Sequence, residues 1–181
     1  MAEFRLETDR LILREWGDDD FGSLHALCTD PQVMATIGPL NDEAATRGFL
    51  SRLQERQELY GCTFWAMERR SDARVLGFCG ISLGTVPHIA SELEIGWRLA
   101  SDCWGQSYAR EGAEASIDWA RAERPGRDIW AITGVINKRS RGLMERLGMQ
   151  RRPDMDFAHP SVPDGAPLKP HVTYVLPAEV E

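Results

Sequence analysis

The chain has 181 residues, which is enough for one domain with a substantial core, and we expect a single domain over residues 1–181. Its formal net charge of −7 argues against a general nucleic-acid binder, because such a protein needs a basic face. No stretch reaches the roughly 18 unbroken apolar residues of a membrane helix, so no membrane partner is expected.

The cysteines and the first ten residues indicate in which cellular compartment the protein is expected. The segment MAEFRLETDR contains no apolar signal core. The cysteines and histidines show no paired spacing of a metal site. We therefore expect a cytoplasmic protein without a metal, whose reduced thiols are Cys28, Cys62, Cys79 and Cys103.

The predicted elements of the first half are a strand, two helices and a hairpin. RLILREW, at residues 10–16, alternates as a strand does. Asp18 or Asp19 is expected to cap the first helix, and Asn41 the second, longer one. TFWAME and VLGFCGISL read as a hairpin that turns at Ser71–Asp72.

The second half reads as strand, helix and strand. Strands are predicted at residues 91–99 and 129–136, and helical spacing between them places four apolar residues on one face, Ala109, Ala113, Ile117 and Ala120. This order predicts a parallel pair joined by a crossover. A short helix at 138–147 and a last strand at 171–176 follow. The fold class is mixed α/β (α+β), with a mostly antiparallel central sheet and flanking helices.

The segment CWGQSYA, at residues 103–109, lies directly before the crossover helix. A helix N-terminus offers unpaired N–H groups to an anion, and Gly105, Ser107 and Ala109 would let an anion approach closely. A tight turn without a ligand explains the same residues. The segment lacks the lysine of a P-loop and the three glycines of the Rossmann fingerprint, which disfavours a dinucleotide-binding protein.

WGQSYA resembles the pyrophosphate loop of the GNAT acetyltransferases, and most closely that of the RimJ/RimL-type branch, the ribosomal-protein N-terminal acetyltransferases. Three further segments resemble that branch in order: TDRLILR, LEIGWRL and NKRSRGLMERLGM. The resemblance covers roughly residues 5–176 and implies the GNAT fold with its parallel crossover. It also implies acetyl-CoA as cosubstrate and leaves a homodimer open.

The resemblance assigns the cofactor site residue by residue. The backbone of Trp97, Arg98 and Leu99 would pair with the pantetheine arm, and Asn137 and Ser140 would line its far side. The loop that would hold the pyrophosphate comprises Trp104, Gly105, Gln106, Ser107, Tyr108, Ala109 and Arg110. Ser107 stands where the family usually has glycine. If this position needs a positive φ, serine costs on the order of 1 kcal/mol there.

Acetyl transfer to an amine needs a neutral nucleophile. Only about 0.04 % of a lysine-type amine is neutral at pH 7, against about 10–20 % of an α-amine, so a base matters most for lysine-like acceptors. Glu92 and Glu94 are the candidates, since positions i and i+2 share one face of a strand. The resemblance favours Glu94, which matches the glutamate base of the related histone acetyltransferases.

The acid and the acceptor are less defined by the sequence. Met144 stands where many GNAT enzymes have a tyrosine acid, so Ser140 is the substitute candidate. His159 and His171 would border the acceptor or only pack in the loop. The acceptor is a protein N-terminus or a small-molecule amine. The alternative is a non-catalytic acyl-CoA-binding sensor, which Met144 and Ser107 would suit.

Overall fold

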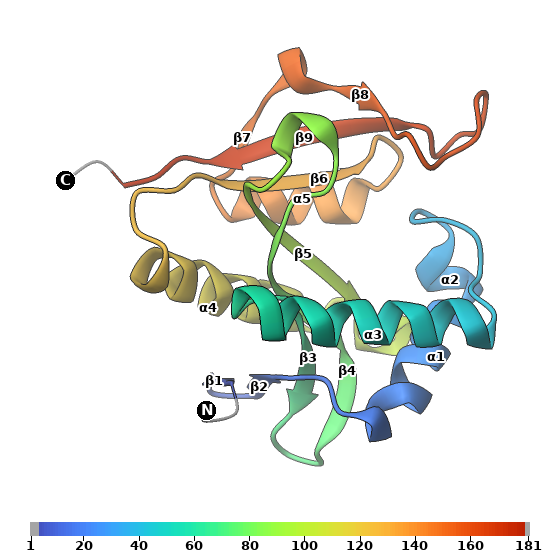
Figure 1. Cartoon of the computed structure of the whole chain (residues 1–181), viewed down its shortest axis with the longest axis vertical. Helices are drawn as coiled ribbons and strands as arrows, with labels where there is room; N and C mark the ends of the chain where they lie inside the picture. Colours follow the sequence, from blue (N-terminus) through green and yellow to red (C-terminus); the bar gives the residue numbers. More distant parts are fainter. Residues whose placement is uncertain (1–3, 180–181) are drawn as a thin grey trace.

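The structure is a computed structural model that describes residues 4–179. Within this range nine strands form one sheet in the order β1-β2-β3-β4-β5-β6-β9-β7, and β8 pairs with β9 (Figure 1). The strands are β1 (Arg5–Glu7), β2 (Leu11–Arg14), β3 (Phe64–Arg69), β4 (Arg74–Leu83), β5 (Leu93–Leu99), β6 (Ile129–Gly134), β7 (Gln150–Arg151), β8 (Phe157–Ala158) and β9 (Pro170–Leu176).

The helices cover the two faces of this sheet. They are α1 (Phe21–Thr29), α2 (Pro31–Met34), α3 (Glu43–Tyr60), α4 (Tyr108–Glu123) and α5 (Lys138–Arg146). Helix α4 packs on β4 and β5 from one side, whereas α1 packs on β4 and α3 from the other. Among the described helices, none combines the length and the apolar composition that crossing a bilayer requires.

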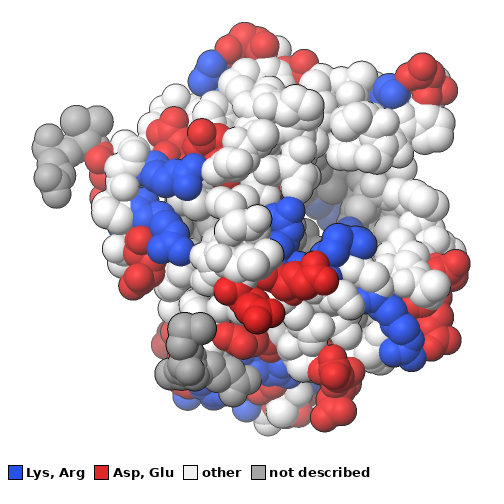
Figure 2. All heavy atoms as spheres, viewed as in Figure 1, with Lys and Arg blue, Asp and Glu red and all other residues white. Residues whose placement is uncertain are grey.

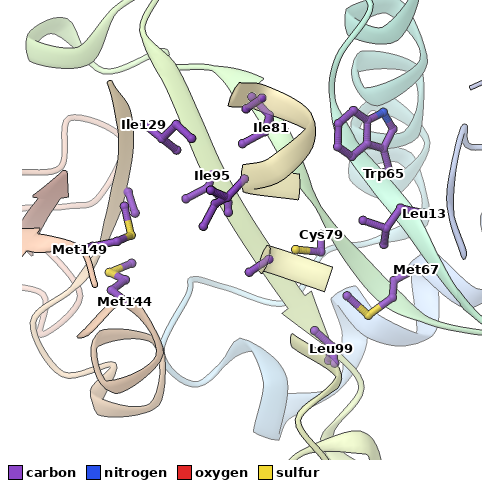
Figure 3. Packing of buried hydrophobic residues seen from close by; sticks show 14 of the residues in the cluster. Leu13, Trp65, Met67, Cys79, Ile81, Ile95, Leu99, Ile129, Met144 and Met149 are labelled. Atoms are coloured by element: carbon purple, nitrogen blue, oxygen red, sulfur yellow. The ribbon is translucent and has the colours of Figure 1, made fainter. Parts of the chain in front are cut away.

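The larger core lies between α4 and the sheet. The α4 residues Ala113, Ile117 and Ala120 are buried there, as their spacing predicts. They meet side chains that alternate along the strands, including Met67, Cys79, Ile81 and Ile95 (Figure 3). A second core, on the opposite face, holds Leu50 and Leu53 of α3 against Phe78 of β4. The predicted mixed α/β class is confirmed.

Two predicted helix caps are wrong by one or two positions. Asp42, not Asn41, caps α3, and its Oδ1 accepts a hydrogen bond from Ala45 N at 2.7 Å. Asp20 occupies the position before α1, and its carboxylate pairs with Arg14 instead of capping the helix. Asparagine and aspartate cap equally well, so neighbouring candidates cannot be separated by residue type.

The feature of the sheet that creates a site is the divergence of β5 and β6. These strands are parallel, as predicted, but pair only through Leu93 with Ile129 and Glu94 with Trp130. Beyond Glu94, β5 keeps its register with β4 up to Leu99. One edge of β5 is therefore left without a strand partner, and Figure 1 shows β5 leading away from β6.

Candidate functional site

A cleft of about 1010 Å³ opens where β5 and β6 separate. It is bounded by the N-terminus of α4, by α5, by α2 and by the segment around β8 and β9. Figure 2 shows the same face hollowed between the upper and lower halves of the molecule. A cleft of this size is at the upper end of the range for small-molecule sites, so it can take an extended ligand.

Segments distant in the sequence meet in this cleft. All predicted site residues line it except Glu92 and Gln106; those present are Glu94, Trp97, Arg98, Leu99, Trp104, Gly105, Ser107, Tyr108, Ala109, Arg110, Asn137 and Ser140. Met144, His159 and His171 line it as well.

The loop before α4 presents a row of unpaired N–H groups. Gly105 and Ser107 adopt left-handed backbone conformations, with φ of 75° and 64°, and α4 begins at Tyr108. Within residues 4–179, no N–H from Gly105 to Arg110 donates a hydrogen bond to the backbone, and no side chain caps the helix. A Cβ at Gly105 would meet nothing within 4 Å. These groups and the helix dipole fit a pyrophosphate.

The positive φ of Ser107 makes a testable prediction about stability. A non-glycine residue in this conformation costs about 1–2 kcal/mol, and the greater unfolded-state entropy of glycine offsets about 0.4–1 kcal/mol of that. Ser107→Gly is therefore expected to raise the melting temperature by about 1–3 °C in thermal unfolding. Ser91→Gly is a matched control, because Ser91 also has a φ of 64°. A lower melting temperature for Ser107→Gly would show that the serine hydroxyl stabilises the loop.

An ionic network that no sequence pattern predicted stabilises this loop. Glu111 of α4 accepts hydrogen bonds from Thr8 Oγ1, Arg10 N and Arg10 Nε at 2.5, 3.0 and 2.6 Å. Arg10 Nη1 also donates to the carbonyl of Gln106 at 3.1 Å. The Gln106 carbonyl thus ties the loop to Arg10, outside the cleft lining. The partners lie about a hundred residues apart in the chain, so no local spacing links them.

Trp104 and the free edge of β5 form the neighbouring wall. The indole Nε1 of Trp104 donates to the carbonyl of Leu99 at 2.9 Å, and Arg139 lies over the indole ring at 4.2 Å. This arrangement fixes Trp104 between the strand edge and α5.

The register of β5 shows which of its backbone groups face the cleft. Gly84 N donates to Glu92 O and Ala100 N to Leu76 O, so the even-numbered residues carry the ladder to β4. The N–H and C=O groups of Ile95, Trp97 and Leu99 point the other way, toward the cleft. The backbone N–H and C=O of Arg98 face β4, so only its side chain can contribute to the cleft.

Glu94 lies at the floor of the cleft. It is half-buried, since the cleft reaches it while protein surrounds it on its other sides. Desolvation raises the pKa of this carboxyl to about 7, against the opposing effect of the nearby Arg56. A carboxyl with such a pKa can both accept and release a proton near neutral pH.

Glu92 occupies a different environment. It precedes β5, and its carboxylate pairs with Arg127 Nη2 at 3.1 Å, outside the cleft lining. The two glutamates therefore do not act as a pair here, and Glu94 is the one placed to meet a ligand.

The α5 side of the cleft holds the remaining candidates. Asn137 caps α5, since its Oδ1 accepts a hydrogen bond from Ser140 N at 3.1 Å. Met144 is buried in the lining, and its thioether has no proton to give. Tyr174 is also buried, and its hydroxyl donates to Glu145 at 3.1 Å. Ser140, the predicted acid candidate, carries a hydroxyl and lines the cleft.

His159 and His171 lie together at the far end of the cleft. Their ring centroids are 4.7 Å apart, and each packs against Phe157. Burial lowers the pKa of both imidazoles. At neutral pH they form a largely uncharged aromatic wall.

Comparison with known proteins identifies the family. The model of the Acetyltransferase (GNAT) domain matches residues 10–150, which is most of the chain. The chain belongs to the GNAT acetyltransferase family. Members of this family transfer acetyl groups, in general from acetyl-CoA, and the GNAT domain match spans the loop and Glu94.

Relatives and solved structures agree with this assignment to the GNAT family. Protein YkkB of Bacillus subtilis (strain 168) is 34% identical over 149 residues, covering 82% of this chain and 86% of YkkB. The N-acetyltransferase YoaA of the same organism is 27% identical over 150 residues, covering 81% of this chain and 82% of YoaA.

Three solved structures share the fold. An acetyltransferase from Agrobacterium tumefaciens strain C58 has a TM-score of 0.76 at 24% identity, covering 97% of this chain and 95% of its own. A ribosomal-protein-S5-alanine acetyltransferase from Vibrio fischeri has a TM-score of 0.74 at 17% identity, with coverages of 99% and 98%. The microcin C7 self-immunity acetyltransferase MccE, solved with acetyl-CoA and AMP, has a TM-score of 0.74 at 12% identity, with coverages of 94% and 93%.

Proposed function

We propose that this chain is a single-domain N-acetyltransferase that moves an acetyl group directly from acetyl-CoA to a primary amine. The observation that carries the proposal is one cleft that contains both an unpaired N–H loop and Glu94. Family membership supports acetyl-CoA as the donor, as does the acetyl-CoA complex of the structurally similar MccE.

The residues divide between binding and chemistry. The N–H groups from Gly105 to Ala109 would hold the pyrophosphate, and the cleft-facing backbone of Trp97 and Leu99 would hydrogen-bond the pantetheine arm. The Trp97 N–H, next to Arg98, would stabilise the oxyanion that develops on the thioester carbonyl.

Glu94 would serve as general base. The amine nitrogen attacks the thioester carbon, a C–N bond forms and the C–S bond breaks. The proton that the nitrogen loses passes to the Glu94 carboxylate, directly or through a water molecule. The departing thiolate takes its proton from Ser140 or from water, since Met144 cannot donate one.

The acceptor class is an amine of one of two kinds. The structural similarity to a ribosomal-protein acetyltransferase suits a protein N-terminus, but at 17% identity it shows only the fold. A small-molecule amine would equally fit the cleft, whose lining includes the adjacent aromatic rings of His159 and His171.

The first test is ligand binding measured by thermal unfolding. Acetyl-CoA at about 100 times its Kd adds about 2.7 kcal/mol, which raises the melting temperature of a chain of this length by roughly 5–10 °C. NAD serves as the control and is expected to have no effect. The absence of a shift with acetyl-CoA would contradict the proposed cofactor site.

The second test separates an enzyme from a sensor. Release of free CoA thiol is measured with a panel of amines, including N-terminal peptides and small diamines. Turnover on any of these amines supports the enzyme. Tight acetyl-CoA binding without turnover on any amine favours the non-catalytic acyl-CoA-binding module.

A further inference from the structure

Arg98 has a side chain in the cleft that the proposed reaction does not use. Along β5, Leu93, Ile95 and Leu99 are buried in the core under α4. Glu94, Gly96 and Arg98 therefore project from the opposite face, since side chains alternate along a strand. The Glu94 carboxyl and the Arg98 guanidinium thus stand on the same wall of the cleft, with Gly96 between them.

Arg98 forms no salt bridge with any residue that the structure describes. Its Cζ lies 5.2 Å from the ring centroid of Phe78 and 5.7 Å from that of Phe49. Its hydrogen bond to Cys28 Sγ is long, at 3.5 Å, and no carboxylate pairs with it within residues 4–179. Burial lowers the pKa of Arg98. By contrast, the half-buried Arg14 is paired with both Asp20 and Glu68.

Leaving a desolvated cation without a counter-ion is costly, and the cost is recovered when an anion binds. The planar guanidinium fork suits a carboxylate, which it can hold through two parallel hydrogen bonds. The cleft's other basic residues on α4 and α5 are Arg110, Lys138, Arg139 and Arg146, on the side where the pyrophosphate loop lies. Arg98 is on the wall of Glu94, where the acceptor amine would bind, and one cation there suits an acceptor with one negative charge.

The wall between Glu94 and Arg98 is apolar. A Cβ at Gly96 would lie 2.8 Å from Phe64 Cε1, so the Phe64 ring covers this position, and it stacks on Phe78 at 5.7 Å. The Cα atoms of Glu94 and Arg98 are four residues apart on one strand, which spans about 13 Å. Side chains stand roughly perpendicular to a sheet, so we take this value as the spacing of the two charged groups. Subtracting about 3 Å for a hydrogen bond at each end leaves about 7 Å, which about four or five methylene groups fill.

We propose that Arg98 binds an anionic group of the acceptor, which is a primary amine carrying a carboxylate about four or five methylene groups from its nitrogen. The amine lies at Glu94, the methylene chain lies over Phe64 and Phe78, and the carboxylate lies at Arg98. This inference rests on the proposed acetyltransferase function and specifies its acceptor class.

The test compares matched acceptors and matched variants. kcat/KM is measured at saturating acetyl-CoA for 5-aminopentanoate, its neutral counterpart pentylamine, and 4-aminobutylphosphonate. The wild type is expected to favour 5-aminopentanoate over pentylamine by at least about tenfold. Arg98→Met is expected to reduce this preference to about twofold or less, whereas Arg98→Lys restores part of it. Arg52→Met is the control, because Arg52 also lies over Phe49 but is exposed and outside the cleft lining.

A binding measurement keeps the two proposals separable. The reaction product 5-acetamidopentanoate and its neutral counterpart N-pentylacetamide are titrated by calorimetry into the wild type and Arg98→Met in the presence of CoA. Binding of the anion that is lost in Arg98→Met, without turnover of any amine, would support the anion site and contradict the acetyltransferase function. Turnover with equal preference for both amines, or a preference that survives Arg98→Met, would overturn the role of Arg98. A preference for the phosphonate would overturn the assignment to a carboxylate.

Discussion

Replacing Glu94 by glutamine is expected to lower kcat/KM for amine acetylation by about 10²–10⁴-fold, the usual contribution of a positioned general base. Acetyl-CoA affinity is expected to stay unchanged, because the loop proposed to bind the pyrophosphate is a separate part of the cleft. Steady-state kinetics and calorimetry measure the two quantities. Glu92→Gln is the control, since its carboxylate pairs with Arg127 outside the cleft and its loss is expected to leave turnover intact.

The pH dependence of the acetylation rate also tests whether Glu94 is the general base. A base must be deprotonated, so wild-type activity is expected to rise with a midpoint near pH 7, the raised pKa of Glu94. The glutamine variant is expected to keep only the gradual rise caused by deprotonation of the amine. A midpoint near 7 that persists in Glu94→Gln would assign the titration to another group.

The raised pKa of Glu94 also predicts how this residue changes the stability of the fold with pH. The folded protein holds the Glu94 proton more tightly than the unfolded chain, whose glutamate has a pKa near 4.5. Between pH 4.5 and about 7 the unfolded state therefore binds fewer protons, and this group makes folding less favourable as the pH rises. Glu94→Gln is expected to raise the melting temperature at pH 8 more than at pH 5, which also shows that the variant folds.

Introducing aspartate at Gly105 is expected to weaken acetyl-CoA binding by about 10–100-fold. The new Cβ would meet nothing within 4 Å, so the side chain fits, but its carboxylate stands beside the N–H groups assigned to the pyrophosphate. Like charges a few ångströms apart near a protein surface repel by about 2–4 kcal/mol. The loss is expected to shrink at high salt, because exposed charges are screened.

Gly126→Asp is the control for this second prediction. Gly126 has a φ of 73°, against 75° for Gly105, and a Cβ there would also meet nothing within 4 Å. Because Gly126 does not line the cleft, both variants are expected to lose similar stability, but only Gly105→Asp loses acetyl-CoA affinity. Equal affinity in the two variants would place the pyrophosphate elsewhere.

Local sequence patterns indicated much of the architecture. Helical spacing placed Ala113, Ile117 and Ala120 on the buried face of α4, and alternation located β3, β4 and β5. The strand, helix, strand order predicted the parallel pair of β5 and β6. These features depend on neighbours within a few positions of one another.

Short elements escaped prediction for the opposite reason. Strands β1, β7 and β8 contain two or three residues each, and helix α2 contains four. Such segments carry too few residues to show a period, and they form because a partner strand or helix is already in place. Likewise, the choice of Asp42 over Asn41 as a cap depends on where the chain turns into α3.

The sequence by itself indicated the glycine-containing loop before α4, a glutamate on β5 and the periodic elements that carry both. Only the tertiary structure decided what each side chain meets. It paired Glu92 with Arg127, left Glu94 in the cleft and joined Arg10 to Glu111. It also placed Arg98 beside Phe49 and Phe78, with no counter-ion among residues 4–179. The reason is physical: backbone periodicity is set locally, whereas burial and charge pairing depend on residues that folding brings together from distant parts of the chain.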